Sequence, residues 1–245
     1  MLLADLHIHS KWSDGKLTIA EIVDLFGESG HDVIAITDHV VNSDNLIGKV
    51  THRFGLTVTR ENFDAYRAEV EEEARRAWDE YGMLVLPGVE LTQNRFRRNA
   101  SAHALALGID EFVSAEGSVE EMLTRAHESG AVVVACHPNE QSEYFANTFY
   151  LWNQREEISR LVHLWELACR WDLFPPVARA RLPYVGNSDF HDRPHLYAWK
   201  TLLPCEKRAA DVLRTLKRGA GLAVTRMERF DEARGAAPRL ALATA

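Results

Sequence analysis

The chain of 245 residues lacks several features that mark whole classes of protein. It has only three cysteines, Cys136, Cys169 and Cys205, and they stand far apart in the sequence. An odd number of isolated cysteines excludes a disulfide framework and paired-cysteine zinc sites, and it favours a reducing compartment. Long uncharged apolar runs are also missing, so we expect no membrane-spanning segment and no membrane partner.

A basic N-terminal region is missing as well, because residues 1–5 (MLLAD) turn polar at once. We therefore predict no signal peptide and a cytoplasmic location. The 28 Lys and Arg residues are outnumbered by 36 Asp and Glu residues, which gives a net charge of -8. This balance argues against a stable nucleic-acid partner, although bound divalent cations would still permit a small phosphorylated ligand. Composition leaves the oligomeric state open.

What the chain does contain is an alternation of strand-like and helix-like segments. Near-continuous apolar runs at residues 32–37 and 131–138 are typical of buried parallel strands. Thr18 with Glu21, and Ser118 with Glu121, form capping-box patterns that predict two helix starts. With about seven strand–helix units and no repeat or linker, we expect a single α/β domain built as a barrel.

Two segments depart from this alternation. Residues 40–60 read as a long polar connection, of the kind that is usually functional or mobile. Residues 227–245 show no clear pattern, and we predict a loosely ordered C-terminal tail there. The predicted domain therefore covers residues 1–226.

Residues of metal-binding type recur where the predicted strands end. His7 and His9 are two apart at the end of the first strand, so both point to the same side. In a parallel barrel all the carboxyl ends of the strands meet at one face. His103 differs, because it stands at the start of its predicted strand. The full candidate set is His7, His9, Asp14, His39, Glu90, His103, His137, Asp189 and His191.

Nine such residues are too many for one ion, so we expect two to three divalent metal ions. The set contains histidines and carboxylates but no cysteine, which suits Zn, Mn or Fe, with Mg as a further option.

Five short motifs carry a family resemblance. Asp5-Leu6-His7-Ile8-His9-Ser10, Ile36-Thr37-Asp38-His39, Gly88-Val89-Glu90, Cys136-His137-Pro138 and Asn187-Ser188-Asp189-Phe190-His191 resemble, in this order, the motifs of the PHP (polymerase and histidinol phosphatase) family. The resemblance runs from Leu3 to about Leu202. It implies a distorted (β/α)7 barrel, a trinuclear metal centre and hydrolysis of phosphoesters.

The resemblance also implies which residues share a metal. His7, His9, Glu90 and Asp189 would hold the first ion, and Glu90 would bridge to a second ion bound by His103 and His137. Asp14, His39 and His191 would hold the third. Many family members have His where this chain has Asp14, and the added negative charge favours a harder ion such as Mn or Mg.

The implied chemistry is attack on phosphorus by a hydroxide formed from a water that the metals acidify. Glu90, Asp189 and His191 are the candidate catalytic residues. The leaving group would take its proton from Asp189, from a neighbouring histidine or from a water on the metals. Arg95, Arg97 and Arg98 lie between two expected ligands and either bind the substrate phosphate or form a solvated charged loop.

Two other functions compete with a phosphoesterase acting on a nucleotide or on a sugar or alcohol phosphate. An amidohydrolase-type enzyme also opens with H-x-H on a barrel strand, but the early His39 and the Asp189-x-His191 pair disfavour it. A non-catalytic metal-stabilised module of PHP type is the other alternative, and the complete set of nine residues disfavours that. Asp38 either caps its strand or orients a ligand histidine. Glu166 faces the metal side of its strand without being an expected ligand.

Overall fold

The computed structural model describes residues 1–44, 46–95, 99–138, 148–228 and 241–242. The strands are β1 Leu2–Ile8, β2 Val33–Ile36, β3 His39–Val41, β4 Leu84–Gln93, β5 Ala102–Leu107, β6 Val132–Ala135, β7 Leu164–Cys169, β8 Asp172–Leu173, β9 Tyr184–Asn187, β10 Trp199–Leu203, β11 Ala223–Arg226 and β12 Ala241–Leu242. The helices are α1 Ile19–Glu28, α2 Leu46–Arg53, α3 Phe63–Tyr81, α4 Val119–Glu128, α5 Tyr150–Asn153, α6 Pro176–Arg179, the 3-10 helix η1 Arg193–Tyr197 and α7 Ala209–Arg218.

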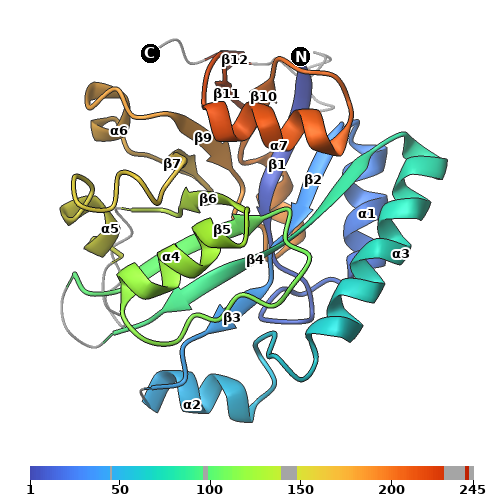
Figure 1. Cartoon of the computed structure of the whole chain (residues 1–245). Helices are drawn as coiled ribbons and strands as arrows, with labels where there is room; N and C mark the ends of the chain where they lie inside the picture. The colour runs from blue at the N-terminus through green and yellow to red at the C-terminus, as the bar shows by residue number, and fades with distance from the viewer. Residues whose placement is uncertain (45, 96–98, 139–147, 229–240, 243–245) are drawn as a thin grey trace.

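A single curled, mixed sheet forms the centre of the domain (Figure 1). Its strands pair in the order β12-β11-β10-β1-β2-β4-β5-β6-β7-β8, while β3 pairs with β4 and β9 with β7. A bridge between Ile8 and Phe190 links the end of β1 to the segment that follows β9. The sheet therefore curls until segments from both ends of its central path meet beside β1.

The single α/β domain expected from the sequence is confirmed, but the expectation that its strands run parallel is wrong for part of the sheet. β5 runs antiparallel to both β4 and β6, and β10 runs antiparallel to β1. Only residues 94–101 connect β4 to β5, which is too short for the crossover that a parallel pair needs. Because β5 is reversed, His103 at its start lies at the same edge as the carboxyl ends of the parallel strands.

The connection over residues 40–60, predicted as a loop, holds two regular elements instead. β3 pairs with the far half of β4, opposite Glu90, Leu91 and Thr92. The short helix α2 follows it. A three-residue strand and an eight-residue polar helix leave too little hydrophobic periodicity to be recognised in a sequence.

The two predicted capping boxes are confirmed. Thr18 accepts from the Glu21 backbone at 3.2 Å, and the Glu21 carboxylate accepts from the Thr18 backbone at 2.8 Å. Ser118 and Glu121 repeat the arrangement at the start of α4. These bonds satisfy backbone donors that a helix start leaves unpaired.

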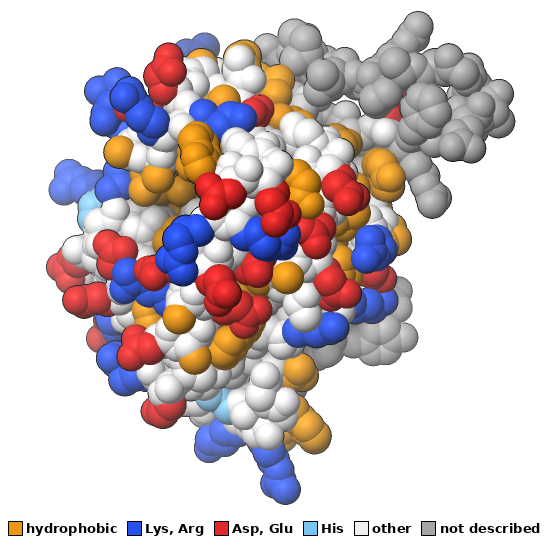
Figure 2. Space-filling model, turned by 90° about the vertical axis from the view of Figure 1, so that its right-hand side faces the viewer, with side chains coloured by type: hydrophobic (Ala, Val, Ile, Leu, Met, Phe, Trp, Pro, Cys, Tyr) orange, Lys and Arg blue, Asp and Glu red, His pale blue; other side chains and the backbone are white. Residues whose placement is uncertain are grey.

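Hydrophobic packing places the site residues by fixing the faces of the strands. On β1, Ala4 and Leu6 lie in a buried apolar cluster that includes Val212 and Leu216 of α7. Since side chains alternate along a strand, Asp5 and His7 face the opposite side of β1. Helices α1 and α3 lie side by side along one flank of the sheet (Figure 1). Charges of both signs are interspersed over much of the face shown in Figure 2.

Within the residues described, no helix combines the length and the apolar character needed to cross a bilayer. The domain boundary near residue 226 stays a prediction. Most of the tail lies outside the described residues, but Ala241–Leu242 pairs with β11.

Candidate metal centre

All nine candidate ligands converge at one edge of the sheet. His7 is the last residue but one of β1 and His9 follows that strand, His39 opens β3, and Glu90 lies within β4. His103 lies near the start of β5 and His137 follows β6. Asp189 and His191 follow β9. Residues from opposite ends of the chain thus share one cluster, which the reversed β5 completes.

The carboxylate of Glu90 is the hub of the cluster. Its Oε2 lies 3.4 Å from His7 Nε2, 3.3 Å from His9 Nε2 and 2.9 Å from His39 Nδ1. Its Oε1 lies 3.0 Å from His103 Nδ1 and 3.3 Å from His137 Nε2. Each oxygen therefore faces a different group of histidines.

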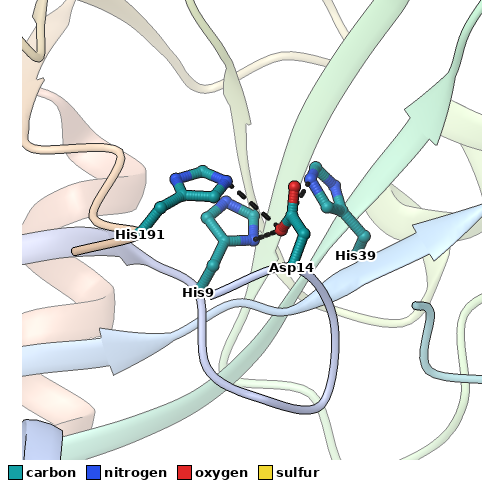
Figure 3. Close-up of side chains that lie close together, drawn as sticks. All are labelled: His9, Asp14, His39 and His191. Atoms are coloured by element: carbon teal, nitrogen blue, oxygen red, sulfur yellow. Dashed lines mark ion pairs between the residues drawn. The ribbon is translucent and has the colours of Figure 1, made fainter. Parts of the chain in front are cut away.

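Two aspartates occupy the other side of the cluster. Asp189 Oδ1 lies 3.6 Å from His7 Nε2, 3.5 Å from His9 Nε2 and 3.3 Å from His191 Nδ1. Asp14 is more exposed, and its Oδ1 lies 3.2 Å from His191 Nε2 and 3.6 Å from His39 Nε2. Figure 3 shows His9, His39 and His191 arranged around the Asp14 carboxylate.

The backbone is strained at two of these positions. His137 has a φ of 21° and Asp189 a φ of 46°, both in a region that residues other than glycine rarely adopt. Such conformations persist where the surrounding structure enforces them, and they concentrate at functional sites.

Burial and neighbouring charge shift the pKa values of the cluster in opposite directions. Burial alone would lower the pKa of His7, but the carboxylates of Glu166, Glu90 and Asp189 raise it well above its ordinary value. Burial would raise the pKa of Glu90, but its histidines hold it well below the usual range. The pKa of Asp189 is likewise lowered, against the effect of burial. The carboxylates thus stay ionised, and the site favours positive charge at its centre.

Several buried atoms in the cluster make no hydrogen bond. They include His7 Nε2, His9 Nε2 and both carboxylate oxygens of Glu90. Buried polar groups without partners are costly, and a cation among these nitrogens and oxygens would satisfy them together. Four groups of described residues offer donor atoms within 4.8 Å of one another: His9, Asp14, His39 and His191; His7, Glu90 and His137; His7, His9 and Asp189; and His7, Glu166 and Cys169. The first three consist of candidate ligands alone. The residues present therefore fit divalent metal ions held by nitrogen and oxygen donors.

Glu166, which was not expected to be a ligand, contacts two of the candidate ligands. Its Oε1 lies 2.9 Å from His7 Nδ1, and its Oε2 accepts the His137 backbone N–H at 2.6 Å. Asn187 donates to Oε1 at 2.8 Å. Glu166 thus fixes two candidate ligands from behind, as carboxylates often do in metal sites. Its predicted place on the metal side of its strand was the one signal available in the sequence.

Arg170 is a site residue that the sequence did not indicate. Its guanidinium contacts Asp189 Oδ2, the oxygen turned away from the histidines. This leaves Oδ1 of Asp189 facing the cluster. No motif marks Arg170, because its role arises only from the packing of the segments after β7 and β9.

Within the residues described, Asp38 bonds to the loop after β1 and makes no direct hydrogen bond to a candidate ligand histidine. Its carboxylate accepts from the Ser10 backbone at 2.8 Å and from the Ser13 hydroxyl at 2.7 Å. Ser13 Oγ in turn lies 3.5 Å from His9 Nδ1. Asp38 therefore anchors the loop after β1 and reaches His9 only through Ser13.

The candidate phosphate-binding arginines remain a prediction. Arg97 and Arg98 lie outside the described residues. The Arg95 guanidinium bonds to Gln93 Oε1 at 2.9 Å and to the Gly117 carbonyl at 3.4 Å. In this arrangement Arg95 supports the neighbouring loop.

Part of the chain is similar to a known protein family. Residues 5–115 match the family model of the PHP domain. The phosphoribosyl 1,2-cyclic phosphate 1,2-diphosphodiesterase of Eggerthella lenta is 26% identical over 110 residues, which are 45% of this chain and 32% of that protein. The match therefore spans only about a third of the length of that relative.

Solved structures share the fold at low sequence identity. A two-domain protein of Bacteroides vulgatus, described as containing a predicted PHP-like metal-dependent phosphoesterase, has a TM-score of 0.65 at 18% identity, covering 91% of this chain and 64% of its own. A putative metal-dependent phosphoesterase of Bifidobacterium adolescentis has a TM-score of 0.52 at 17% identity, covering 78% and 88%. An amidohydrolase of Chromobacterium violaceum with bound sulfate has a TM-score of 0.52 at 15% identity, covering 77% and 87%.

These structural matches show that the fold is similar, and nothing more. The family-model match over residues 5–115 covers the motifs that carry His7, His9, His39 and Glu90. Residues 5–115 therefore match the PHP domain, and the fold of the chain is similar to that of the Bacteroides vulgatus protein.

Proposed function

We propose that the chain is a metal-dependent phosphoesterase that hydrolyses a small phosphorylated molecule, such as a nucleotide or a sugar or alcohol phosphate. The observation that carries the proposal is the hub at Glu90, whose two buried oxygens face five histidines from four segments without a hydrogen bond. A buried carboxylate with two oxygens directed at separate groups of imidazoles suits the bridge of a multi-metal centre.

Three ions are the proposed content of the centre. His7, His9 and Asp189 would hold the first together with Glu90 Oε2, and His103 and His137 would hold the second together with Glu90 Oε1. The third would lie with His39, His191 and Asp14. His9 Nδ1, 3.9 Å from Asp14 Oδ1, adjoins this third group. The proposed metal is Zn, Mn, Fe or Mg, and the carboxylate of Asp14 favours the harder ions.

Bound divalent ions would supply a water of lowered pKa and would offset negative charge on the phosphoryl group. Glu90 keeps the histidine groups in fixed relative positions. Asp189 is held by Arg170 through Oδ2, so its Oδ1 is oriented to accept a proton from the attacking water. His191 bonds to the Asp189 carbonyl through Nδ1 at 2.9 Å and presents Nε2 to Asp14. It thereby joins the two aspartates of the site.

Metal analysis combined with a substrate panel tests this proposal. The purified protein should retain about one to three divalent ions per chain and hydrolyse at least one phosphomonoester or phosphodiester. Diesters belong in the panel because the Eggerthella lenta relative carries the name of a cyclic phosphodiesterase. Hydrolysis of a lactone or amide without any phosphoesterase activity would instead support the amidohydrolase alternative.

Two substitutions sharpen the test. His7→Ala and Glu90→Ala should each abolish phosphoester hydrolysis and lower the metal content, because each removes a donor at the centre of the cluster. Cys136→Ala is the matched control, since Cys136 is equally buried but packs in the apolar cluster with Val132 and Val134. Retained activity in Glu90→Ala would contradict the bridging role. Less than one bound ion, with no activity after Mn or Zn is restored, would favour the non-catalytic module.

A further inference from the structure

A cavity of about 690 Å³ lies beside the candidate metal centre, and none of the predicted site residues lines it. Among the described residues its walls include Leu25, Trp171, Arg193, Tyr197, Arg226 and Glu228. The volume falls within the usual range of small-molecule sites. The cavity is therefore large enough for an organic group attached to a phosphate.

His195 lies between the candidate ligand His191 and Trp171, one of the residues that line the cavity. The His195 ring lies 6.3 Å from the His191 ring on one side and 6.2 Å from the Trp171 ring on the other, measured between centroids. The His191 backbone N–H donates to His195 Nδ1 at 3.0 Å. Trp171 also follows Arg170, which contacts Asp189. Two residues that line the cavity thus stand close to the centre: Arg193 is two residues after the candidate ligand His191, and Trp171 is next to Arg170.

The chemistry of the walls selects for a flat ring. Trp171 is 45% exposed, an unusual position for a large aromatic side chain. The Arg226 guanidinium lies over its ring at 5.4 Å from the centroid, which holds the indole in place by a cation–π contact. Tyr197 adds a second aromatic wall.

The residues that line the cavity also favour a negatively charged ligand. Arg193 and Arg226 are exposed, and neither side chain forms an ion pair with any carboxylate that the structure describes. Two guanidiniums outweigh the single carboxylate of Glu228 in a chain whose net charge is -8. Guanidiniums without carboxylate partners bind carboxylate or phosphate groups well, often through two parallel hydrogen bonds.

We propose that this cavity binds the leaving-group part of the substrate, and that this part carries a flat ring and an anionic substituent. The inference rests on the proposed phosphoesterase function and narrows it to a class of substrate. Trp171 and Tyr197 contact the ring, and Arg193 and Arg226 bind the anionic group.

Kinetics with two matched esters test the substrate preference. We expect kcat/KM for 6-carboxy-2-naphthyl phosphate to exceed that for 2-naphthyl phosphate by about tenfold, the size of one charge-assisted hydrogen bond. In the double variant Arg193→Gln/Arg226→Gln this ratio should fall to near one. Arg214→Gln, on α7 and paired with Asp211, should keep the wild-type ratio. An unchanged ratio in the double variant would overturn the proposal.

A binding measurement tests the cavity independently of catalysis. By titration calorimetry, 6-hydroxy-2-naphthoate should bind the purified protein at least about tenfold more tightly than 2-naphthol, and Trp171→Ala should weaken both. This result would support ligand binding in the cavity whether or not a phosphoester is hydrolysed. A failure to hydrolyse any phosphoester would refute the proposed function and leave the cavity proposal standing. Equal affinity for both compounds would refute the anion site. Tight binding of 6-hydroxy-2-naphthoate, combined with equal kcat/KM for the two naphthyl phosphates, would refute the proposal that the cavity binds the leaving group.

Discussion

His7 shows at the scale of one residue how a site is built from both nitrogens of an imidazole. Its Nε2 faces Glu90 and Asp189, while its Nδ1 lies 2.9 Å from Glu166. A carboxylate behind a ligand histidine fixes the ring orientation and leaves the other nitrogen free to bind a metal. The sequence motif contains only the histidine, because its partner Glu166 lies 159 residues further along the chain.

Glu166→Gln should lower metal affinity by about 10- to 100-fold, because the amide cannot accept from both His7 and the His137 backbone as the carboxylate does. Competition with a chromogenic chelator measures the affinity. Glu156→Gln, an exposed substitution on the segment before β7, should leave it unchanged. Unaltered metal affinity in Glu166→Gln would show that Glu166 does not position the ligands.

His31 lies apart from the candidate metal centre and affects how the stability of the fold depends on pH. It is buried against Phe26, and burial together with the Lys200 charge lowers its pKa to about 3. An unfolded histidine has a pKa near 6.5, so the unfolded state binds the extra proton more readily below that pH. Stability contributed by neutral His31 is therefore complete above about pH 6.5 and is lost as the pH falls towards 3.

His31→Asn should reduce the acid sensitivity of folding. Asn can still donate to the Phe26 carbonyl, which lies 3.2 Å from His31 Nδ1, but it cannot be protonated. Between pH 6 and pH 4 the free energy of unfolding should fall less steeply in the variant, by up to about 1.4 kcal/mol per pH unit. Urea unfolding at several pH values measures this slope. Parallel slopes in both proteins would contradict the assignment.

At the scale of elements, the loop between β1 and α1 decides where Asp14 lies. Asp38 at the end of β2 anchors this loop through Ser10 and Ser13. Gly15 closes the loop against the backbone of His9, and a Cβ at this position would meet the His9 carbonyl oxygen at 2.2 Å. The loop can pack this closely only because residue 15 has no side chain.

Gly15→Ala should therefore displace Asp14 and disrupt the group it forms with His39 and His191. We expect the loss of about one bound metal ion per chain, with little change in the far-UV circular dichroism spectrum, because the strands are untouched. Lys11→Ala, in the same loop but exposed, should retain the full metal content. Full metal content in Gly15→Ala would argue that Asp14 is no ligand.

At the scale of the whole molecule, a buried ion pair ties the two ends of the domain together. Lys200 of β10 lies 3.0 Å from Asp5 of β1, and both side chains are fully buried. Asp5 Oδ1 also accepts the Ser188 backbone N–H at 3.1 Å, next to Asp189. Burial lowers the pKa of Lys200, although Asp5 opposes the shift. The pair thus links three distant segments directly behind the metal centre.

Lys200→Met should destabilise the fold by about 3–5 kcal/mol, because it leaves Asp5 as a buried charge without a cation. Chemical denaturation followed by circular dichroism measures the change. Lys207→Met, which breaks the partly exposed pair with Asp32, should cost less than about 1 kcal/mol. An equal loss of unfolding free energy in both variants would show that the buried pair stabilises the fold no more than the partly exposed pair does.

The sequence predicted the strand ends and helix starts well, because their signals are local. The capping boxes at Thr18 and Ser118 and the buried runs of β2 and β6 appear where they were expected. The direction of β5 and the short element β3 were missed. Strand direction depends on the length of a connection and on pairing partners that no local pattern specifies.

The sequence by itself therefore determined the kinds of residue available and their approximate places, because six of the eleven histidines follow or open apolar runs. Only the tertiary structure decided which atoms face one another. It brought His103 to the same edge through a reversed strand, placed Glu166 and Arg170 behind the candidate ligands, and set a cavity beside His195. The physical reason is that such contacts join residues distant in the chain, and their geometry follows from how the sheet curls and packs rather than from any local pattern.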